Sequence, residues 1–395
     1  MDSTATCTVT CSDSQPTEFI LPDFFSDCPY PMRLNPHCDP VSRAIEQWLC
    51  SEAHLVEPEA TKYTTILRPG YFASVCFPDA DAFHLKVCAD FLGWSFKMDD
   101  WLEIERSDVN DAWGVRDCCI SAYRVRDTSL CVHVSRGNGS QVLQNVSDIY
   151  MPLVVTSGWS DGRYQLLLTY RDPANFQTER YSGKMCKSYF SRFKETGGPG
   201  CTERFIHGMD LWFISAAKEV ENRAKGHIND VESYIELRRD LSGCKACFAF
   251  TEFACQIDLP DEVVSHPVII ALEEAANDFI SWSNDIFSYN LEQFHHSTNN
   301  SVAVLMVKQG LDLQGAIDYC GRLCNISLQR FEENRANLPS WGEEIDKDVA
   351  KYVEGLQNWI TGTLQWSFES ARYFGKDAHI VKQNRIVKLL PKRPL

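Results

Sequence analysis

The fold is decided by one stretch, residues 267–292, which reads PVIIALEEAANDFISWSNDIFSYNLE. Its apolar side chains recur every three or four residues, the period of a helix with one buried face. The apolar positions are Leu272, Ala276, Phe279, Ile280, Ile286 and Phe287. The stretch therefore predicts one long helix whose apolar face is covered by other elements.

The same helical period recurs on both sides of this stretch. It is found in residues 41–107, 203–224, 301–337 and 345–373. We therefore predict an all-α, single-domain bundle over residues 21–375. Residues 1–20 are polar and small and are expected to form a flexible leader. The basic residues 376–395 are expected to form a solvated tail.

One region departs from the helical pattern. Residues 125–171 are rich in Val, Ser, Gly and Thr, with strand-like pieces, and the dipeptide Tyr-Arg occurs at 123–124 and again at 170–171. We interpret residues 125–171 as an insertion, and our hypothesis is that it is translated intervening sequence. Sequencing the transcript tests this: a message spliced across these codons confirms it, and one that retains them makes the segment a real loop or small subdomain.

Composition and charge exclude several classes of partner. The 395 residues carry a formal net charge of −16, which disfavours nucleic acid and anionic lipid. No apolar run reaches the roughly 18 residues of a membrane helix, and no signal peptide opens the chain. With 17 cysteines in no framework spacing, we expect reduced thiols in the cytoplasm. The lone C-x-x-C of Cys244 and Cys247 lacks a second ligand pair, so a zinc site is not favoured.

Two acidic or polar sets have the spacing of metal ligands. In F-K-M-D-D-W-L-E, Asp99 and Asp100 precede Glu103, and Asp99 and Glu103 lie one helical turn apart. Carboxylates in this arrangement suit Mg²⁺, although a solvated acidic face has the same pattern. In N-D-I-F-S-Y-N-L-E the oxygen donors are placed four residues apart, at Asn284, Ser288 and Glu292. They share one helical stripe and can bind Mg²⁺ while leaving positions for diphosphate oxygens.

Two basic sets could contact phosphate. Arg238 and Arg239 are adjacent in Y-I-E-L-R-R-D-L-S-G, and guanidinium groups can fork onto phosphate oxygens. Arg372 and Tyr373 follow near the end of the last long predicted helix and could supply two more donors. Adjacent arginines are often surface charge, so neither set identifies a site by itself.

Together the four sets resemble class I terpene synthases, most closely the sesquiterpene cyclases of mushroom-forming fungi. Arg238 precedes Asn284 by 46 residues (284 − 238), and Arg372 follows Asn284 by 88 (372 − 284), close to the family's spacing. The resemblance implies a helical bundle that encloses an active-site cavity. It implies Mg²⁺-dependent ionisation of farnesyl diphosphate, cyclisation of the carbocation and release of diphosphate. Three Mg²⁺ ions are expected, with Mn²⁺ as an alternative ion.

The resemblance also implies roles for single residues. Asp99 would bind two metal ions, with Asp100 and Glu103 in the same motif. The second set would hold the third ion through Asn284, Ser288 and Glu292. Around the diphosphate, Arg238 would act as sensor, Ser242 as effector position, and Arg372 and Tyr373 as hydrogen-bond donors, with Arg239 beside the sensor. The rings expected to line the cavity are those of Phe96 and Trp366.

The sequence departs from the family pattern at two positions. Glu103 stands where many relatives have Asp, and Leu291 stands where many have a diphosphate-binding lysine. Two other functions remain open: an isoprenyl diphosphate synthase, which normally carries two aspartate-rich motifs, and a non-catalytic helical homologue. The sequence specifies neither the product skeleton nor the oligomeric state.

Overall fold

Helices dominate the computed structural model, which describes residues 16–52, 55–104 and 181–393. The prediction of an all-α protein is therefore confirmed. The segment 125–171, interpreted above as an insertion, lies outside the described residues.

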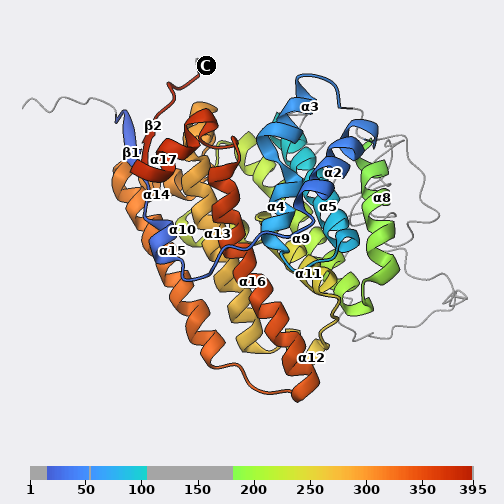
Figure 1. The fold of residues 1–395 in the computed structure, drawn as a ribbon. Coiled ribbons are helices and arrows are strands. Elements are labelled where there is room, and N and C mark those ends of the chain that lie inside the picture. The colour runs from blue at the N-terminus through green and yellow to red at the C-terminus, as the bar shows by residue number, and fades with distance from the viewer. Residues whose placement is uncertain (1–15, 53–54, 105–180, 394–395) are drawn as a thin grey trace, which may run out of the picture.

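The longer helices form the bundle shown in Figure 1. They are α2 (Cys38–Glu52), α4 (Pro69–Cys76), α5 (Ala82–Ile104), α8 (Tyr181–Thr196), α9 (Pro199–Ala224), α10 (Val231–Leu241), α11 (Cys244–Cys255), α13 (Pro267–Phe294), α14 (Ser301–Gln309), α15 (Leu313–Ala336) and α16 (Glu343–Glu369). The shorter elements are α1 (Phe24–Asp27), α3 (Glu59–Thr61), the π-helix η1 (Lys62–Leu67), α12 (Asp261–Val264), the 3₁₀ helix η4 (Gly375–Asp377) and α17 (Ala378–Asn384).

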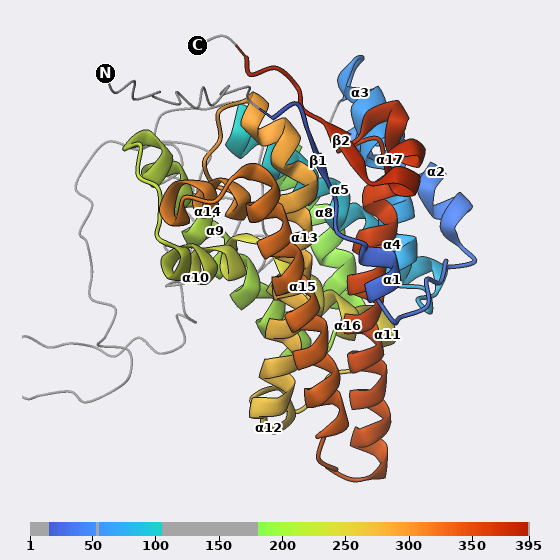
Figure 2. The ribbon, with the colours of Figure 1, turned by 90° about the vertical axis from the view of Figure 1, so that its left-hand side faces the viewer.

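The deciding stretch forms α13, as the apolar period predicted. The helix begins at Pro267, where the missing backbone N–H costs nothing, and it continues to Phe294. The apolar side chains that gave the helical period are buried, Leu272 and Phe287 completely. Figures 1 and 2 show α15 and α16 running alongside α13. These two helices provide the cover that the apolar face requires.

Two predicted helices end differently in the structure. Residues 301–337 form two helices instead of one, because Gly310 ends α14 with a left-handed backbone (φ 68°). The helix predicted over 345–373 ends at Glu369. Ser370 is extended, and the N–H of Ala371 donates to the carbonyl oxygen of Ile66 at 3.2 Å. Arg372 and Tyr373 therefore follow the helix instead of ending it.

The boundaries predicted at residues 20 and 376 are corrected by a small sheet. Strands β1 (Glu18–Ile20) and β2 (Ile386–Lys388) pair antiparallel at one end of the bundle (Figure 1). Phe19 and Val387 face each other in the register, and both are buried. The burial and the backbone hydrogen bonds between the strands hold β1 and β2 in place. The polar or basic composition of the two chain ends had suggested that these residues would be free.

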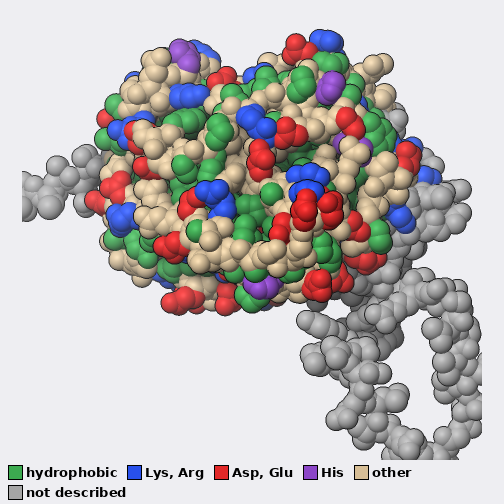
Figure 3. All heavy atoms as spheres, turned by 60° about the horizontal axis from the view of Figure 1, so that its bottom comes forward, with side chains coloured by type: hydrophobic (Ala, Val, Ile, Leu, Met, Phe, Trp, Pro, Cys, Tyr) green, Lys and Arg blue, Asp and Glu red, His purple; other side chains and the backbone are tan. Residues whose placement is uncertain are grey.

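Many basic side chains outside the core lie beside an acidic one. On the face shown in Figure 3, acidic and basic side chains lie next to one another. Arg33, for example, contacts both Asp79 and Glu354. Within the residues described, no helix combines the length and hydrophobicity needed to cross a membrane.

Glu273, on α13, predicts a pH dependence of stability. Burial raises its pKa to about 7, and its carboxylate accepts a hydrogen bond from the Tyr352 hydroxyl at 2.7 Å. Because the folded state holds this proton more tightly, the contribution of Glu273 to stability falls as pH rises from about 4.5 to 7. We expect Glu273→Gln to be more stable than wild type by about 1–2 kcal/mol at pH 8, with little difference at pH 4.5. Urea unfolding at the two pH values measures this, and a pH-independent difference would contradict it.

Candidate active site

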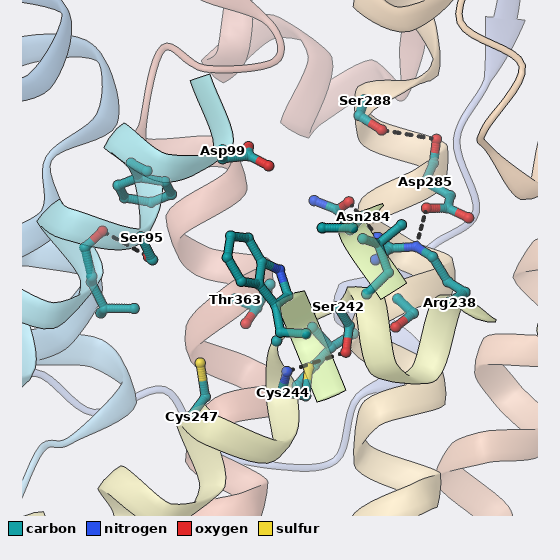
Figure 4. A pocket seen from close by; sticks show the side chains of 18 of the residues that line it. Ser95, Asp99, Arg238, Ser242, Cys244, Cys247, Asn284, Asp285, Ser288 and Thr363 are labelled. Atoms are coloured by element: carbon teal, nitrogen blue, oxygen red, sulfur yellow. Dashed lines mark hydrogen bonds and ion pairs between the residues drawn. The ribbon is translucent and has the colours of Figure 1, made fainter. Parts of the chain in front are cut away.

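A cavity of about 270 Å³ opens between α5, α9, α10, α11, α13 and α16. Figure 4 shows Asp99, from α5, facing Asn284 and Arg238 across it. The two predicted metal motifs therefore share one cavity. The predicted site residues that line it are Phe96, Asp99, Arg238, Ser242, Asn284, Ser288, Glu292, Trp366, Arg372 and Tyr373.

Asn284 connects the two basic sets. Its Oδ1 accepts a hydrogen bond from Nη2 of Arg238 at 2.8 Å, and its Nδ2 donates to the Tyr373 hydroxyl at 2.7 Å. Burial raises the pKa of the Tyr373 phenol, so this hydroxyl keeps its proton. Residues 135 positions apart along the chain (373 − 238) thus meet at one amide.

Across the cavity from Asn284, Asp99 is paired with Arg372. Nη2 of Arg372 donates to Oδ2 of Asp99 at 3.0 Å. The same guanidinium lies 5.4 Å from the ring centroid of Phe96 and 5.6 Å from that of Tyr373, which is cation–π geometry. The first acidic motif and the Arg-Tyr pair are therefore in direct contact.

Asp285 is a site residue that the sequence reasoning missed. This carboxylate is buried and accepts from Nε of Arg238 at 2.9 Å, from the Tyr234 hydroxyl at 2.6 Å and from the N–H of Ser301 at 3.0 Å. Burial and the Asp285 charge raise the pKa of Tyr234 well above its ordinary value, which keeps the phenol as a donor. Its position beside Asn284 in the motif is the one signal that could have pointed to it.

Ser288 and Glu292 share a second unpredicted partner, Asn300. Nδ2 of Asn300 lies 3.1 Å from Oε2 of Glu292 and 3.4 Å from Oγ of Ser288, and it also donates to the carbonyl oxygen of Asp285 at 2.7 Å. Burial, followed by repulsion from Asp285, raises the pKa of Glu292 to about 7. Hydrogen bonds from Ser288 and Asn300 and the charge of Arg238 act in the opposite direction, and a further cation would favour the charged carboxylate.

The donor atoms of this stripe fit a divalent cation. An amide oxygen, a hydroxyl and a carboxylate project from successive turns of α13 into the cavity at Asn284, Ser288 and Glu292. Oxygen donors of this kind are those that Mg²⁺ binds in proteins. The side chains of Asp100 and Glu103 lie outside the described residues.

Aromatic rings make up a large part of the remaining cavity wall. The Trp366 ring stacks on Phe72 at 4.4 Å and on Phe96 at 5.4 Å between centroids, and its Nε1–H donates to the Leu67 carbonyl oxygen at 2.6 Å. That hydrogen bond fixes the orientation of the indole. Further rings line the cavity, those of Phe91, Trp94, Trp212 and Trp359.

Arg239, expected beside the sensor, is not among the residues that line the cavity. Consecutive helix positions differ by about 100° in direction, and Arg239 therefore points away from the side that Arg238 faces. Its guanidinium forms a two-bond pair with Asp278, with Nε at 2.7 Å and Nη2 at 2.8 Å from the carboxylate oxygens. This pair joins α10 to α13 outside the cavity.

Ser242 lies at the break between α10 and α11. Gly243 has a left-handed backbone (φ 73°), which ends α10 and starts α11 beside the cavity. Oγ of Ser242 donates to Oδ1 of Asn277 at 2.8 Å and accepts from the N–H of Cys244 at 3.1 Å. The hydroxyl is therefore held inside the break.

Solved structures show which fold class this arrangement belongs to. A structure of α-eudesmol synthase superposes with a TM-score of 0.67 over 86% of this chain and 97% of that one, at 18% identity. Wild-type cucumene synthase superposes with a TM-score of 0.63 over 86% and 99%, at 20% identity. The chain has the class I terpenoid cyclase fold.

Sequence relatives identify the family within this fold. Residues 162–330 match the family model "Terpene synthase family 2, C-terminal metal binding". Sesquiterpene synthase Agr1 of Cyclocybe aegerita is 39% identical, with 96% of this chain and 95% of the relative covered, and Sesquiterpene synthase 1 of Postia placenta is 39% identical over 97% and 98%. Alpha-muurolene synthase of Coprinopsis cinerea is 37% identical over 97% and 80%. The chain belongs to the terpene synthase family and is an enzyme, a sesquiterpene synthase of the fungal type.

Proposed function

We propose that this enzyme ionises farnesyl diphosphate with the help of three Mg²⁺ ions and cyclises the resulting carbocation. One observation carries the proposal: oxygen donors from α5 and α13 face each other across a cavity whose wall also carries a group of aromatic rings. Asp99 on one side and Asn284, Ser288 and Glu292 on the other would hold the ions. Bound there, Mg²⁺ supplies Lewis-acid stabilisation of the departing diphosphate.

The protein's own donors complete the stabilisation of the leaving group. Arg238, Arg372 and Tyr373 project N–H and O–H groups into the polar end of the cavity. Charge-assisted hydrogen bonds of this kind contribute roughly 1.5–3 kcal/mol each. In this chain the arginines carry more of the task, because Leu291 occupies the position where many relatives have a lysine.

The aromatic wall then receives the carbocation. Ring faces attract cations by about 0.5–2 kcal/mol each, which is enough to favour one cyclisation step over another. Phe72, Phe96 and Trp366 form a continuous stack on this wall. An apolar wall also keeps water away from a species that water would quench.

Incubation with farnesyl diphosphate tests the proposal. With Mg²⁺ present we expect volatile sesquiterpene in the headspace and free diphosphate in solution, and with EDTA we expect neither. When isopentenyl diphosphate is added as the five-carbon co-substrate, longer diphosphates would instead identify a chain-elongating synthase, although the second motif here is N-x-x-x-S-x-x-x-E, not a second aspartate-rich motif. Unchanged substrate under both conditions would identify a non-catalytic homologue.

Phe96→Ala is expected to change the product mixture more than the total rate. The ring stacks on Trp366 and lies under the Arg372 guanidinium, so its removal reshapes the wall without removing a metal ligand. Gas chromatography of the products measures the change. Phe190→Ala, a buried ring outside the cavity lining, is the control and should lower stability without redirecting products. An unchanged product spectrum for Phe96→Ala would remove this ring from the reacting region.

The proposal also covers the cellular location of the enzyme and its binding to nucleic acid. We infer a cytoplasmic location from the free thiols among the described residues, none of which forms a disulfide, and from the acidic balance of the chain. The same acidic balance opposes binding to nucleic acid.

A further inference from the structure

The C-terminal segment lies along the last turns of α13. Nδ2 of Asn290 donates to the carbonyl oxygen of Lys388 at 2.9 Å, and Oδ1 of Asn290 accepts from the N–H of Leu390 at 2.8 Å. Nε2 of Gln293 donates to the Leu390 carbonyl oxygen at 2.8 Å. Farther along, the N–H of Arg393 donates to the carbonyl oxygen of Phe294 at 3.1 Å. The tail therefore follows the helix to its end.

The helix positions that bind the tail alternate with the proposed metal ligands. Ser288 and Glu292 face the cavity, whereas Asn290 and Gln293 face the tail. Both amides are buried, 6% and 8% exposed, and a buried amide is costly unless its hydrogen bonds are made. The backbone of residues 388–390 makes those bonds.

The tail is itself held in place by the sheet. On the outer edge of β1, the Gln314 amide of α15 forms two hydrogen bonds with Ile20. It donates to the Ile20 carbonyl oxygen at 3.0 Å and accepts from the Ile20 N–H at 2.9 Å. On the outer edge of β2, Asn290 forms the corresponding two hydrogen bonds, with the Lys388 carbonyl oxygen and the Leu390 N–H. One amide on α15 and one on α13 thus fix the two-stranded ribbon on both sides.

We call the contacts of the tail with Asn290 and Gln293 the clamp. It supports the end of α13, where Glu292 lies within the last turn before Phe294. The last carbonyl groups of a helix lack intrahelical partners, and terminal turns open with little free-energy cost. A metal ligand must hold its position within about 0.5 Å to bind well. The loop after the helix caps part of this turn, since the Ser297 N–H donates to the Glu292 carbonyl oxygen at 2.9 Å, and the tail caps the Phe294 carbonyl oxygen at 3.1 Å.

We propose that residues 386–393 are a positioning element of the active site, which holds Ser288 and Glu292 in place through Asn290 and Gln293. The inference rests on the proposed function, because it assigns the clamp to the metal-binding stripe. It gives the tail a role in metal affinity that its basic composition does not suggest.

Thermal unfolding with MgCl₂ and inorganic diphosphate tests the clamp without requiring turnover. Ligands that bind the folded state raise its melting temperature, so the Mg²⁺ concentration at half-maximal rise reports affinity. For Asn290→Ala we expect that concentration to increase about tenfold, the range found when residues supporting metal ligands are removed. In steady-state assays the Mg²⁺ requirement should increase by the same factor, while kcat at saturating Mg²⁺ stays near wild type.

Gln314→Ala is the matched control. It removes two hydrogen bonds of the same kind from the other edge of the ribbon, so stability should fall, though less than in Asn290→Ala because these bonds are exposed, while the Mg²⁺ requirement stays unchanged. Leu390→Pro alters the tail alone and removes the N–H that donates a hydrogen bond to Oδ1 of Asn290. It should raise the Mg²⁺ requirement severalfold, and it decides the matter if Asn290→Ala fails to fold.

Two outcomes separate the inference from the function on which it rests. A wild-type Mg²⁺ midpoint in Asn290→Ala or Leu390→Pro overturns the clamp and leaves the proposed function standing. If wild type itself shows no stabilisation by Mg²⁺ and diphosphate, the proposed function fails, and the clamp fails with it.

Discussion

Glu292→Ala is expected to abolish turnover while leaving the fold intact. Glu292 is the one carboxylate in the donor stripe of α13, so its loss leaves an amide and a hydroxyl to hold a doubly charged ion. We expect kcat to fall by at least about 10³-fold, the upper range for removing one charge-stabilising group. Headspace analysis of product formed from farnesyl diphosphate measures this loss.

The stability of this variant distinguishes a chemical defect from a folding defect. Burial and Asp285 already raise the pKa of Glu292 to about 7, so its carboxylate does not stabilise the metal-free fold at neutral pH. We expect an unchanged melting temperature, or one up to about 2 °C higher. Glu274→Ala, which removes a half-exposed carboxylate of the same helix outside the cavity, should keep wild-type turnover. Near-wild-type turnover in Glu292→Ala would refute the metal assignment.

The parts of the fold that the sequence predicted well are those determined locally. The buried face of α13 repeats at the helical period, so its extent could be read within a few residues from the pattern alone. The ends that were misplaced depend on distant partners. The helix predicted to reach residue 373 stops at Glu369, followed by a contact between Ala371 and Ile66. The pairing of residues 18–20 with 386–388 likewise follows no local rule.

The same distinction separates the site residues that were found from those that were missed. Asn284, Ser288 and Glu292 could be recognised because a spacing of four keeps donors on one face of a helix. Asp285 is one position from that face, and Asn300 caps the start of α14, so spacing indicates neither. The geometry that excluded Arg239 from the cavity could have been applied beforehand, since adjacent helical side chains diverge by about 100°.

Asp285→Ala is expected to lower the free energy of unfolding by about 3–5 kcal/mol, the cost of breaking a buried ion pair by removing one partner. Arg238 would keep its charge in a site where its side chain is 12% exposed, and the Tyr234 hydroxyl and Ser301 N–H would lose their acceptor. Turnover should fall as well, because Asp285 orients the guanidinium that is proposed to contact diphosphate. Urea unfolding and product analysis give the two quantities.

A double substitution separates the structural role of Asp285 from its role in orienting Arg238. Asp285→Ala combined with Arg238→Met removes the uncompensated charge, so part of the lost stability should return while turnover stays low. With Arg238→Met also measured alone, the coupling energy between the two positions measures the pair directly. If the single and double variants lose equal stability, the buried charge is not the origin of the cost, and the hydrogen bonds from Tyr234 and Ser301 would have to account for it.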